Sequence, residues 1–511
     1  MLLKRQLQTI IGKSPKLAIK EFVNWGKTQK ANVISCHPTN KEEVSIVIQA
    51  VNEYKGKVKI RCAGSCHSWS PLFADSNNVL IYVDKIKSDY EDKSKIRMSN
   101  KEMCEVDIMT GVTTDELRNF ELKHNVNLEA NVILEAVQMV SVVATGCHGV
   151  GRGTMSPSDH VVRMRIFDSE GELRTYYKDE DPELFKAVAA NFGCFGVIFD
   201  MTMKLKPLRI VKTENTYHRL GDIFQNAYMM KEMVEENWSV ELFWFPYNSF
   251  SHVDNYDPAN DEIWVRQIND ETKQVGLKQH KFYRNKAFVD YVTSHELAAM
   301  TPILVQHPKL TPLFSFFGFN TIKAIIDPVG PIHQELPQAI HFRRYIHLAP
   351  VNDMEFAFDV GDDYEKVIQI INVVVSKVKD SITEQKFPLN IALEMRFMGY
   401  SEACLCPANI GNPETGGTGQ VFYCEVLSVS GTPGWEDFCI YVAEEWMKLG
   451  GIPHLAKEWS FIPNVEKAIK TKMMKGITSF TTQLSKSGAD PNGMFLNSTL
   501  QRLLFEPISE L

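Results

Sequence analysis

The chain has 511 residues, which is enough for two or three domains that each bury a hydrophobic core. Hydrophobic residues make up 44% and charged residues 23%, a composition that excludes disordered, collagen-like and coiled-coil chains. With 55 Lys and Arg against 63 Asp and Glu, the net charge is −8, so we expect no nucleic-acid partner.

The first 30 residues predict a short lead-in helix, because apolar side chains recur at helical spacing. They contain neither the apolar run nor the cleavage site of a signal peptide, and no stretch approaches the roughly 18 apolar residues of a membrane span. The ten cysteines are scattered and form no CxxC pair, so we expect no metal site. We therefore expect an intracellular protein that is not secreted, in the cytoplasm or on an internal membrane.

Residues 31–207 are predicted to form an α+β domain around two glycine-rich loops. The expected strands and helices are 32–35, 41–54, 58–61, 78–83, 160–166, 173–177, 182–191 and 197–206. No G-x-G-x-x-G follows the first strand, which argues against a Rossmann half. The second loop has four glycines between residues 146 and 153, so its backbone is expected to approach something closely.

A second domain is expected from residue 208 to 435, where helices are longer and aromatic residues more frequent. A final segment, 436–511, begins with a clear helix. The most apolar short stretch is 313–319, Leu-Phe-Ser-Phe-Phe-Gly-Phe. It is consistent with core or with a surface patch that rests on a membrane or partner, and we favour core.

The first loop, residues 61–68, reads Arg-Cys-Ala-Gly-Ser-Cys-His-Ser. Successive amides in such a loop form an anion-binding nest. Taken alone, His67 would more simply be a turn residue that caps a helix. The second loop begins Thr145-Gly146-Cys147-His148-Gly149, and a third turn, 191–198, reads Asn-Phe-Gly-Cys-Phe-Gly-Val-Ile. Alone, these are a loop with a hydrogen-bonding histidine and an ordinary helix-to-strand turn.

Polar residues recur in two later segments. On a predicted strand, alternation places Glu394 and Arg396 on one face. Such a pair is most often a surface ion pair, but its neighbours are too apolar for a fully solvated strand. Residues 450–457 read Gly-Gly-Ile-Pro-His-Leu-Ala-Lys and include His454 and Lys457, and residues 490–497 read Asp-Pro-Asn-Gly-Met-Phe-Leu-Asn.

In this order, the motifs resemble the covalent flavoprotein oxidases of the vanillyl-alcohol oxidase type, in the branch of aldonolactone and alditol oxidases. The resemblance covers most of the chain and is weakest from about 265 to 340. It implies an α+β fold: a two-subdomain FAD-binding domain of the p-cresol methylhydroxylase (PCMH) type, and an α+β substrate or cap domain with a large antiparallel sheet. The segment 436–511 would complete the active site.

The resemblance also implies site residues. FAD would be bound covalently through His67, although Cys66 stands where the family usually has glycine. The catalytic residues would be Glu394, Arg396, His454 and Lys457. Leu455 departs from the family's Trp. The expected cofactor-binding residues are Arg61, Ala63, Gly64, Ser65, Cys66, His67, Ser68, Ser141, Thr145, Gly146, His148, Gly149, Gly151, Gly196, Val197 and Ile198.

The implied activity is oxidation of a hydroxyl group of a sugar-derived polyol (an alditol such as mannitol) or of an aldono-1,4-lactone, with reduction of O2 to H2O2. The alternative is a dehydrogenase that passes electrons to a cytochrome or quinone; a binding module without turnover is a third hypothesis. A lysine desolvated beside another cation loses its proton more easily, so Lys457 is the favoured base. Peripheral membrane association and the oligomeric state stay open.

Overall fold

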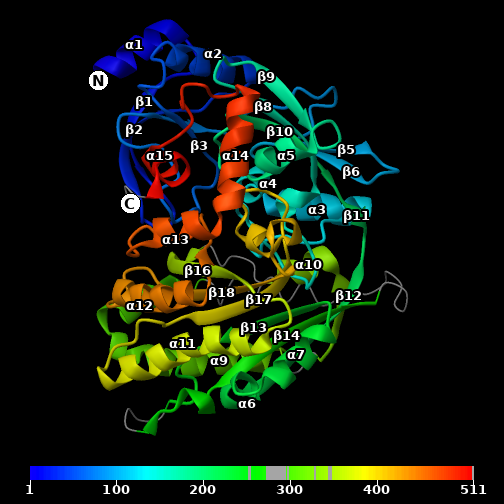
Figure 1. Ribbon diagram of the computed structural model, residues 1–511, viewed down its shortest axis with the longest axis vertical. Helices are drawn as coiled ribbons and strands as arrows, with labels where there is room; N and C mark the ends of the chain where they lie inside the picture. Colours follow the sequence, from blue (N-terminus) through cyan, green and yellow to red (C-terminus); the bar gives the residue numbers. More distant parts are fainter. Residues whose placement is uncertain (251–254, 272–294, 296–297, 327–329, 343–347, 509–511) are drawn as a thin grey trace.

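The computed structural model describes residues 1–250, 255–271, 295, 298–326, 330–342 and 348–508. Figure 1 shows an upper part with two sheets, built by the N-terminal half, and a lower part around one large sheet. The predicted α+β class is confirmed. Within the described ranges, no helix is both long enough and apolar enough to cross a bilayer.

The first sheet has the order β1-β2-β4-β3. Strands β2, β4 and β3 are parallel, and β1 joins β2 antiparallel. The predicted lead-in region therefore holds a strand as well as a helix. The elements are α1 (Leu2–Ile11), β1 (Ala18–Val23), β2 (Lys30–Cys36), α2 (Lys41–Asn52), β3 (Ile60–Ala63) and β4 (Val79–Tyr82). Asn40 caps α2 by accepting from the Glu43 amide, as expected of an Asn before a helix.

The second sheet is antiparallel, with the order β5-β6-β10-β8-β9. Its strands are β5 (Ile96–Asn100), β6 (Glu105–Met109), β8 (Val161–Phe167), β9 (Leu173–Tyr177) and β10 (Val197–Lys204). Helices and a small strand pair complete this part: α3 (Thr114–His124), α4 (Met139–Ala144), α5 (Pro182–Ala189), β7 (Val126–Asn127) and β11 (Lys206–Pro207).

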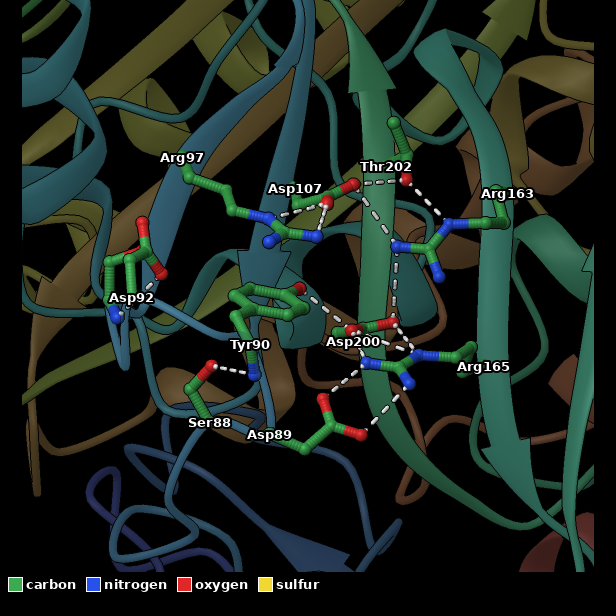
Figure 2. Close-up of polar contacts among 11 residues, drawn as sticks. Ser88, Asp89, Tyr90, Asp92, Arg97, Asp107, Arg163, Arg165, Asp200 and Thr202 are labelled. Carbon is green, nitrogen blue, oxygen red and sulfur yellow. Dashed lines mark hydrogen bonds and ion pairs between the residues drawn. The ribbon is translucent and has the colours of Figure 1, made fainter.

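An ion-pair network on the second sheet holds the chain that links the two sheets (Figure 2). Asp200 is fully buried on β10, and Arg165 pairs both with it and with Asp89 in the connection after β4. The Tyr90 hydroxyl donates to Asp200 at 2.7 Å. Because a buried carboxylate is costly without partners, these contacts fix the connection to the sheet face.

The third sheet has eight strands in the order β15-β12-β14-β13-β17-β18-β16-β19. Its pairs are antiparallel. The strands are β12 (Ile210–Arg219), β13 (Ser239–Trp244), β14 (Glu262–Asp270), β15 (Ile332–Glu335), β16 (Val351–Asp359), β17 (Ala392–Gly399), β18 (Gln420–Val429) and β19 (Ile452–Pro453). We call it the cap sheet. This is the large antiparallel sheet that the resemblance implied.

Helices cover the side of the cap sheet that faces away from the N-terminal half (Figure 1). They are α6 (Leu220–Phe224), α7 (Ala227–Glu235), α11 (Tyr364–Thr383) and α12 (Trp435–Lys448). Helix α10 (Leu336–Ile340) lies at its other side, next to β12 and α3. The apolar side chains of α11, among them Val367, Ile371 and Val374, are fully buried against the sheet layer.

The C-terminal segment is divided between both parts of the molecule. Helix α12 and β19 extend the cap sheet, whereas α13 (Val465–Lys472), α14 (Met474–Ser487) and α15 (Ser498–Phe505) return to the N-terminal half (Figure 1). The Ile60 amide donates to the Met494 carbonyl at 2.8 Å, so the C-terminal signature lies beside β3. The two halves of the chain are thereby interlocked.

The expectation of core for the apolar stretch 313–319 is wrong for most of it. The stretch lies in α9 (Thr311–Ile326), whose Phe319 is 1% exposed while Leu313 is 51% and Phe317 59% exposed. A helix that packs on one side buries only one stripe of its surface, so a continuous apolar run leaves the other stripe in contact with solvent.

Candidate functional site

A deep cavity lies between the N-terminal half and the inner face of the cap sheet. Its volume of about 280 Å³ is many times the roughly 10–15 Å³ that one water molecule requires. The loop 64–68 lines one side, and strands β16, β17 and β18 line the other. Segments from four distant parts of the sequence thus meet around one space.

The loop after β3 has the backbone geometry that its sequence predicted. Cys66 adopts a φ of 59°, a left-handed conformation that favours glycine. A β-carbon on Gly64 would lie 2.7 Å from Oε1 of Gln138 and 2.8 Å from Oγ of Ser141, so a side chain here would displace both. The His67 ring stacks on Trp25 with centroids 4.5 Å apart and an interplanar angle of 23°. The loop therefore presents its backbone and an oriented imidazole to the cavity.

Arg61 lines the cavity from behind this loop. Its guanidinium donates to the carbonyl oxygens of Leu72 at 2.8 Å, Phe495 at 2.7 Å and Phe192 at 2.5 Å. Burial lowers the pKa of Arg61. These three acceptors are neutral carbonyls, so the arginine adds a positive potential beside the loop and ties together three segments of the cavity wall.

The second glycine-rich loop and the turn before β10 approach other backbone closely. A β-carbon on Gly149 would lie 2.5 Å from the Asn131 amide nitrogen, and one on Gly196 would lie 1.9 Å from the Phe167 carbonyl oxygen. Ser141 and Thr145 lie on and just after α4 and line the cavity between these loops.

Most of the predicted cofactor-binding residues line the cavity, but four do not. The residues absent from its wall are Ala63, Gly146, Gly151 and Val197. Ala63 and Val197 are buried in strands. Gly146 and Gly151 have φ values of 61° and 110°. They let the loop turn and pack against Cys406 and Trp238, respectively. All four predicted catalytic residues face the cavity.

Two neighbouring rows of the cap sheet supply the floor of the cavity, which Arg396, Glu394, Glu425 and Glu355 line. In one row, strand pairing aligns Arg266, Glu241, Arg396 and Tyr423. In the next row it aligns Phe243, Glu394, Glu425 and Glu355. Cross-strand partners point to the same face, so charges from five strands gather on one face of the sheet.

Arg396 is the central cation of this floor, and its predicted pairing with Glu394 is confirmed. Its Nη2 donates to Oε2 of Glu394 at 2.6 Å, and Glu241 and Glu425 lie 3.6 and 3.7 Å away. Burial alone would lower the pKa of Arg396, but these carboxylates raise it above its ordinary value. The guanidinium therefore stays charged at the cavity floor.

Lys457 is held differently from what the sequence suggested, because it lies between two carboxyl groups. Its ammonium group donates to Glu425 at 2.5 Å and also pairs with Asp353. Burial works against the charge, yet the two carboxyl groups raise the pKa of Lys457 well above its ordinary value. A lysine between two acids keeps its proton. Lys457 is a fixed cation, and its Nζ also lies 4.7 Å from the centre of the Trp69 ring.

The pKa values of the carboxyl groups around Lys457 shift in opposite directions. Burial and the neighbouring Glu425 raise the pKa of Asp353, whereas Lys457 and Arg396 hold the pKa of Glu425 below its ordinary value despite burial. Glu355 is ionised as well, because His148 and Lys457 outweigh its burial and lower its pKa.

The two predicted histidines, His148 and His454, lie side by side next to Glu355, with ring centroids 5.9 Å apart. Nε2 of His148 contacts Glu355 at 2.7 Å, and its ring stacks on Tyr423 at 3.7 Å. Nδ1 of His454 accepts from the Ala456 amide at 3.2 Å. Burial lowers the pKa of His454 to about 4, so its neutral ring carries the proton on Nε2.

The sequence reasoning missed Glu241, Asp353, Glu355 and Glu425. Each lies on a buried strand, and an acid within an otherwise apolar strand was the available signal. It also missed Asn131 and Gln138, whose buried Nδ2 and Oε1 line the cavity and have no hydrogen-bond partner among the described residues. Across that same part of the chain, no cluster of His, Cys, Asp and Glu is arranged to hold a metal ion.

Two families match this sequence: residues 34–176 match the FAD binding domain, and residues 201–503 match the D-arabinono-1,4-lactone oxidase family. The chain is 22% identical to the L-gulonolactone oxidase of Mus musculus, over 47% of this chain and 52% of that protein. It is 21% identical to the L-gulonolactone oxidase of Scyliorhinus torazame, over 95% of this chain and 98% of that protein. An L-gulono-1,4-lactone dehydrogenase of Mycobacterium tuberculosis is 24% identical, over 50% of this chain and 57% of that protein.

The matches thus span about half the length of the mouse and mycobacterial relatives and nearly all of the third. Among solved structures, a cholesterol oxidase from B. sterolicum superimposes with a TM-score of 0.75 at 16% identity, over 96% of this chain and 97% of that one. At this level of sequence identity, the superposition shows a shared fold only.

FAD is therefore the cofactor of this chain, and the cavity suits it. Gly64 and Gly149 line the wall, and the lack of a β-carbon lets their loops pack closely against Gln138 and the Asn131 backbone. Arg61 supplies positive potential for a pyrophosphate. Asn131 and Gln138 offer an unused donor and an unused acceptor within the described wall. The residues that would hold FAD are those of the loop 64–68, together with Ser141, Thr145, Gln138 and Gly196.

Proposed function

The chain belongs to the family of D-arabinono-1,4-lactone oxidases, and we propose that it oxidises a hydroxyl group of an aldono-1,4-lactone or a related sugar-derived polyol to a carbonyl, with O2 reduced to H2O2. The observation that carries this proposal is the cavity floor. Glu394, Arg396 and Lys457 face, across one space, the loop that ends in His67. A buried floor rich in charged groups suits a small substrate with several hydroxyl groups.

When bound, FAD accepts the hydride that leaves the substrate carbon. The residues of the floor act on the substrate oxygen. Arg396 and Lys457 are both charged, and they stabilise the negative charge that grows on that oxygen as its proton departs. Because neither cation can take the proton, we assign its removal to the Glu394 carboxylate, which lines the cavity beside Arg396.

His454 and Glu355 position the substrate and the charges around it. The Nε2–H of the neutral His454 is the group that can donate to a substrate hydroxyl or ring oxygen. The Glu355 backbone carbonyl accepts from the His454 amide at 2.8 Å, and its ionised side chain pairs with His148. The two histidines are therefore anchored to one residue of β16.

We further propose that FAD is linked covalently through His67. The ring lines the cavity, and its stack on Trp25 fixes its orientation before any bond forms. A fixed imidazole at the wall is the arrangement that covalent attachment needs. The thiols of Cys62, Cys66 and Cys147 also line the cavity, so a test of the link must distinguish the imidazole from them.

A panel of aldono-1,4-lactones and alditols tests the substrate class. Each compound is mixed with the FAD-loaded protein in the absence of air, and loss of the visible flavin absorbance identifies a substrate. The proposal fails if no lactone and no alditol reduces the flavin. Oxygen uptake with stoichiometric H2O2 after readmission of air then supports the oxidase.

A dehydrogenase is the second candidate, because the mycobacterial relative described above carries that name. It predicts slow reoxidation of the flavin by air and fast reoxidation by cytochrome c or a quinone analogue. Comparing the two reoxidation rate constants on the same reduced sample decides between the acceptors.

A further inference from the structure

Three strands of the cap sheet carry a buried row of alternating charges that ends at the cavity. Strand pairing places Arg266 of β14 opposite Glu241 of β13, and Glu241 opposite Arg396 of β17. Arg266 and Glu241 are only 2% and 1% exposed, whereas Arg396 lines the cavity. Glu241 is therefore a buried carboxylate between two guanidinium groups, one of which borders the substrate space.

One oxygen of Glu241 is held in place by Arg266. Nη1 of Arg266 donates to Oε2 of Glu241, and its Nη2 donates to the Ala339 carbonyl of α10 at 2.5 Å. The Arg266 guanidinium also lies 4.1 Å from the centre of the Phe342 ring, which lines the cavity. Because α10 and the Phe342 ring fix this arginine, the position of the Glu241 carboxylate is fixed as well.

The other oxygen of Glu241 faces Arg396 without forming a hydrogen bond. Oε1 of Glu241 lies 3.6 Å from Nε of Arg396. Both atoms are buried, and neither has a hydrogen-bond partner within the described residues. Folded proteins rarely leave a buried donor and a buried acceptor unpaired, and a shift of about half an ångström would join these two.

The remaining carboxylates near Arg396 are already engaged. Glu394 accepts from Nη2 of Arg396 at 2.6 Å. Glu425 lies 3.7 Å from Arg396, but it accepts from Lys457 at 2.5 Å. Of the carboxylates that pair with Arg396 in the described structure, Glu241 is thus the one with a fixed position and an oxygen that is still unused.

A second carboxylate for Arg396 becomes important when Glu394 loses its charge. This step rests on the proposed function, in which Glu394 takes the hydroxyl proton. The O–H bond of the substrate breaks and its proton forms an O–H bond on Glu394, while the electron pair stays on the substrate oxygen and forms the carbonyl as the hydride departs to FAD. A neutral acid binds a guanidinium more weakly than a carboxylate does, so Glu394 loosens its hold on Arg396 while negative charge grows on the substrate oxygen.

We propose that Glu241 is a positioning residue for this reaction. As Glu394 takes up the proton, Arg396 closes onto Oε1 of Glu241, and this contact keeps the guanidinium beside the substrate oxygen. Glu241 is not part of the cavity wall, so it acts on the substrate only through Arg396. A structural ion pair with Arg266 alone would explain why Glu241 is buried, but not why its second oxygen faces Arg396 unused.

A comparison of melting temperatures tests this proposal without any substrate, because Glu394→Gln imitates the protonated Glu394. Glu241→Gln is introduced into the FAD-loaded protein with and without Glu394→Gln. The melting temperature should fall at least about twice as far beside Glu394→Gln, because Arg396 then lacks both carboxylates. Asp107→Asn breaks a buried pair with Arg163 on the second sheet, and as the matched control it should cost the same in both backgrounds.

Anaerobic rapid mixing with a lactone or alditol substrate supplies the second measurement. Glu241→Gln should lower the limiting rate constant of flavin reduction about tenfold, while the dissociation constant of the substrate changes less than about twofold. This split is expected because Arg396 acts on charge that is present only in the transition state. A purely structural role of Glu241 would lower the melting temperature and leave the limiting rate constant of the folded, FAD-loaded variant unchanged.

A second variant covers the case in which Glu241→Gln folds poorly because Arg266 loses its partner. Glu241→Gln/Arg266→Gln removes the whole pair and takes its place in both measurements. The proposal is overturned if the melting temperature falls equally in both backgrounds, or if the limiting rate constant does not change. If no lactone or alditol reduces the flavin of the unaltered protein, the proposed function fails, and the melting temperatures still decide whether Glu241 supports Arg396.

Discussion

Nζ of Lys457 lies 2.5 Å from Oε1 of Glu425, and the same ammonium group pairs with Asp353 on the next strand. This triad joins the C-terminal segment to two strands of the cap sheet. It also decides the chemistry of Lys457, because a cation between two carboxyl groups is stabilised in its charged form.

Lys457→Met should slow anaerobic flavin reduction by about 10²-fold, because one charge that stabilises the substrate oxygen is lost. Lys457→Arg keeps the charge and should retain at least about a tenth of the unaltered rate. A rapid-mixing measurement of the reduction rate constant checks both variants. If Lys457 were the base, the arginine variant would be as slow as the methionine variant, since arginine hardly gives up its proton.

Glu394→Gln should lower the same rate constant by about 10²- to 10⁴-fold, because the amide cannot accept the hydroxyl proton. Glu394→Asp retains a carboxylate and should be much less impaired. The visible flavin spectrum and the melting temperature of both variants serve as controls for folding. Equal rates for the glutamine and aspartate variants would assign the proton transfer to another group.

Local sequence predicted the parts of this site but not their assembly. Alternation placed Glu394 and Arg396 on one face, and the structure confirms their contact. The protonation of Lys457 depends instead on Asp353, which is 104 positions away in sequence and is brought near by the pairing of β16 with β19. Likewise, the backbone strain at Cys66 followed from the loop motif, whereas the apolar run in α9 gave no sign of which stripe would be buried.

His454 should make stability fall in acid. Burial lowers its pKa from the ordinary 6.5 to about 4, so the neutral ring contributes fully above pH 6.5. That contribution is lost as the pH falls from 6.5 to 4, where protonating the buried ring costs roughly 3 kcal/mol. His454→Gln has no imidazole to protonate. The free energies of unfolding of this variant and of the unaltered protein, measured with urea, should therefore differ by about this amount less at low pH than at neutral pH.

His160 serves as an internal check on that comparison. Burial also lowers its pKa to about 4, but it is present in both proteins, so its effect cancels in the difference. A pH-independent difference between the two proteins would mean that His454 is not the group responsible.

The covalent link can be assigned by separating the imidazole from the nearby thiols. His67→Ala should abolish flavin fluorescence in acid-precipitated protein, because no imidazole remains at the end of the loop. Cys66→Gly should keep it, and should also keep stability within about 1 kcal/mol, since glycine tolerates the φ of 59° that cysteine adopts here. Trp25→Ala removes the ring that orients His67 and should lower the covalent fraction while leaving dissociable FAD bound. Acid-stable fluorescence that survived His67→Ala but disappeared in Cys66→Gly would move the link to the thiol and leave His67 as a wall residue.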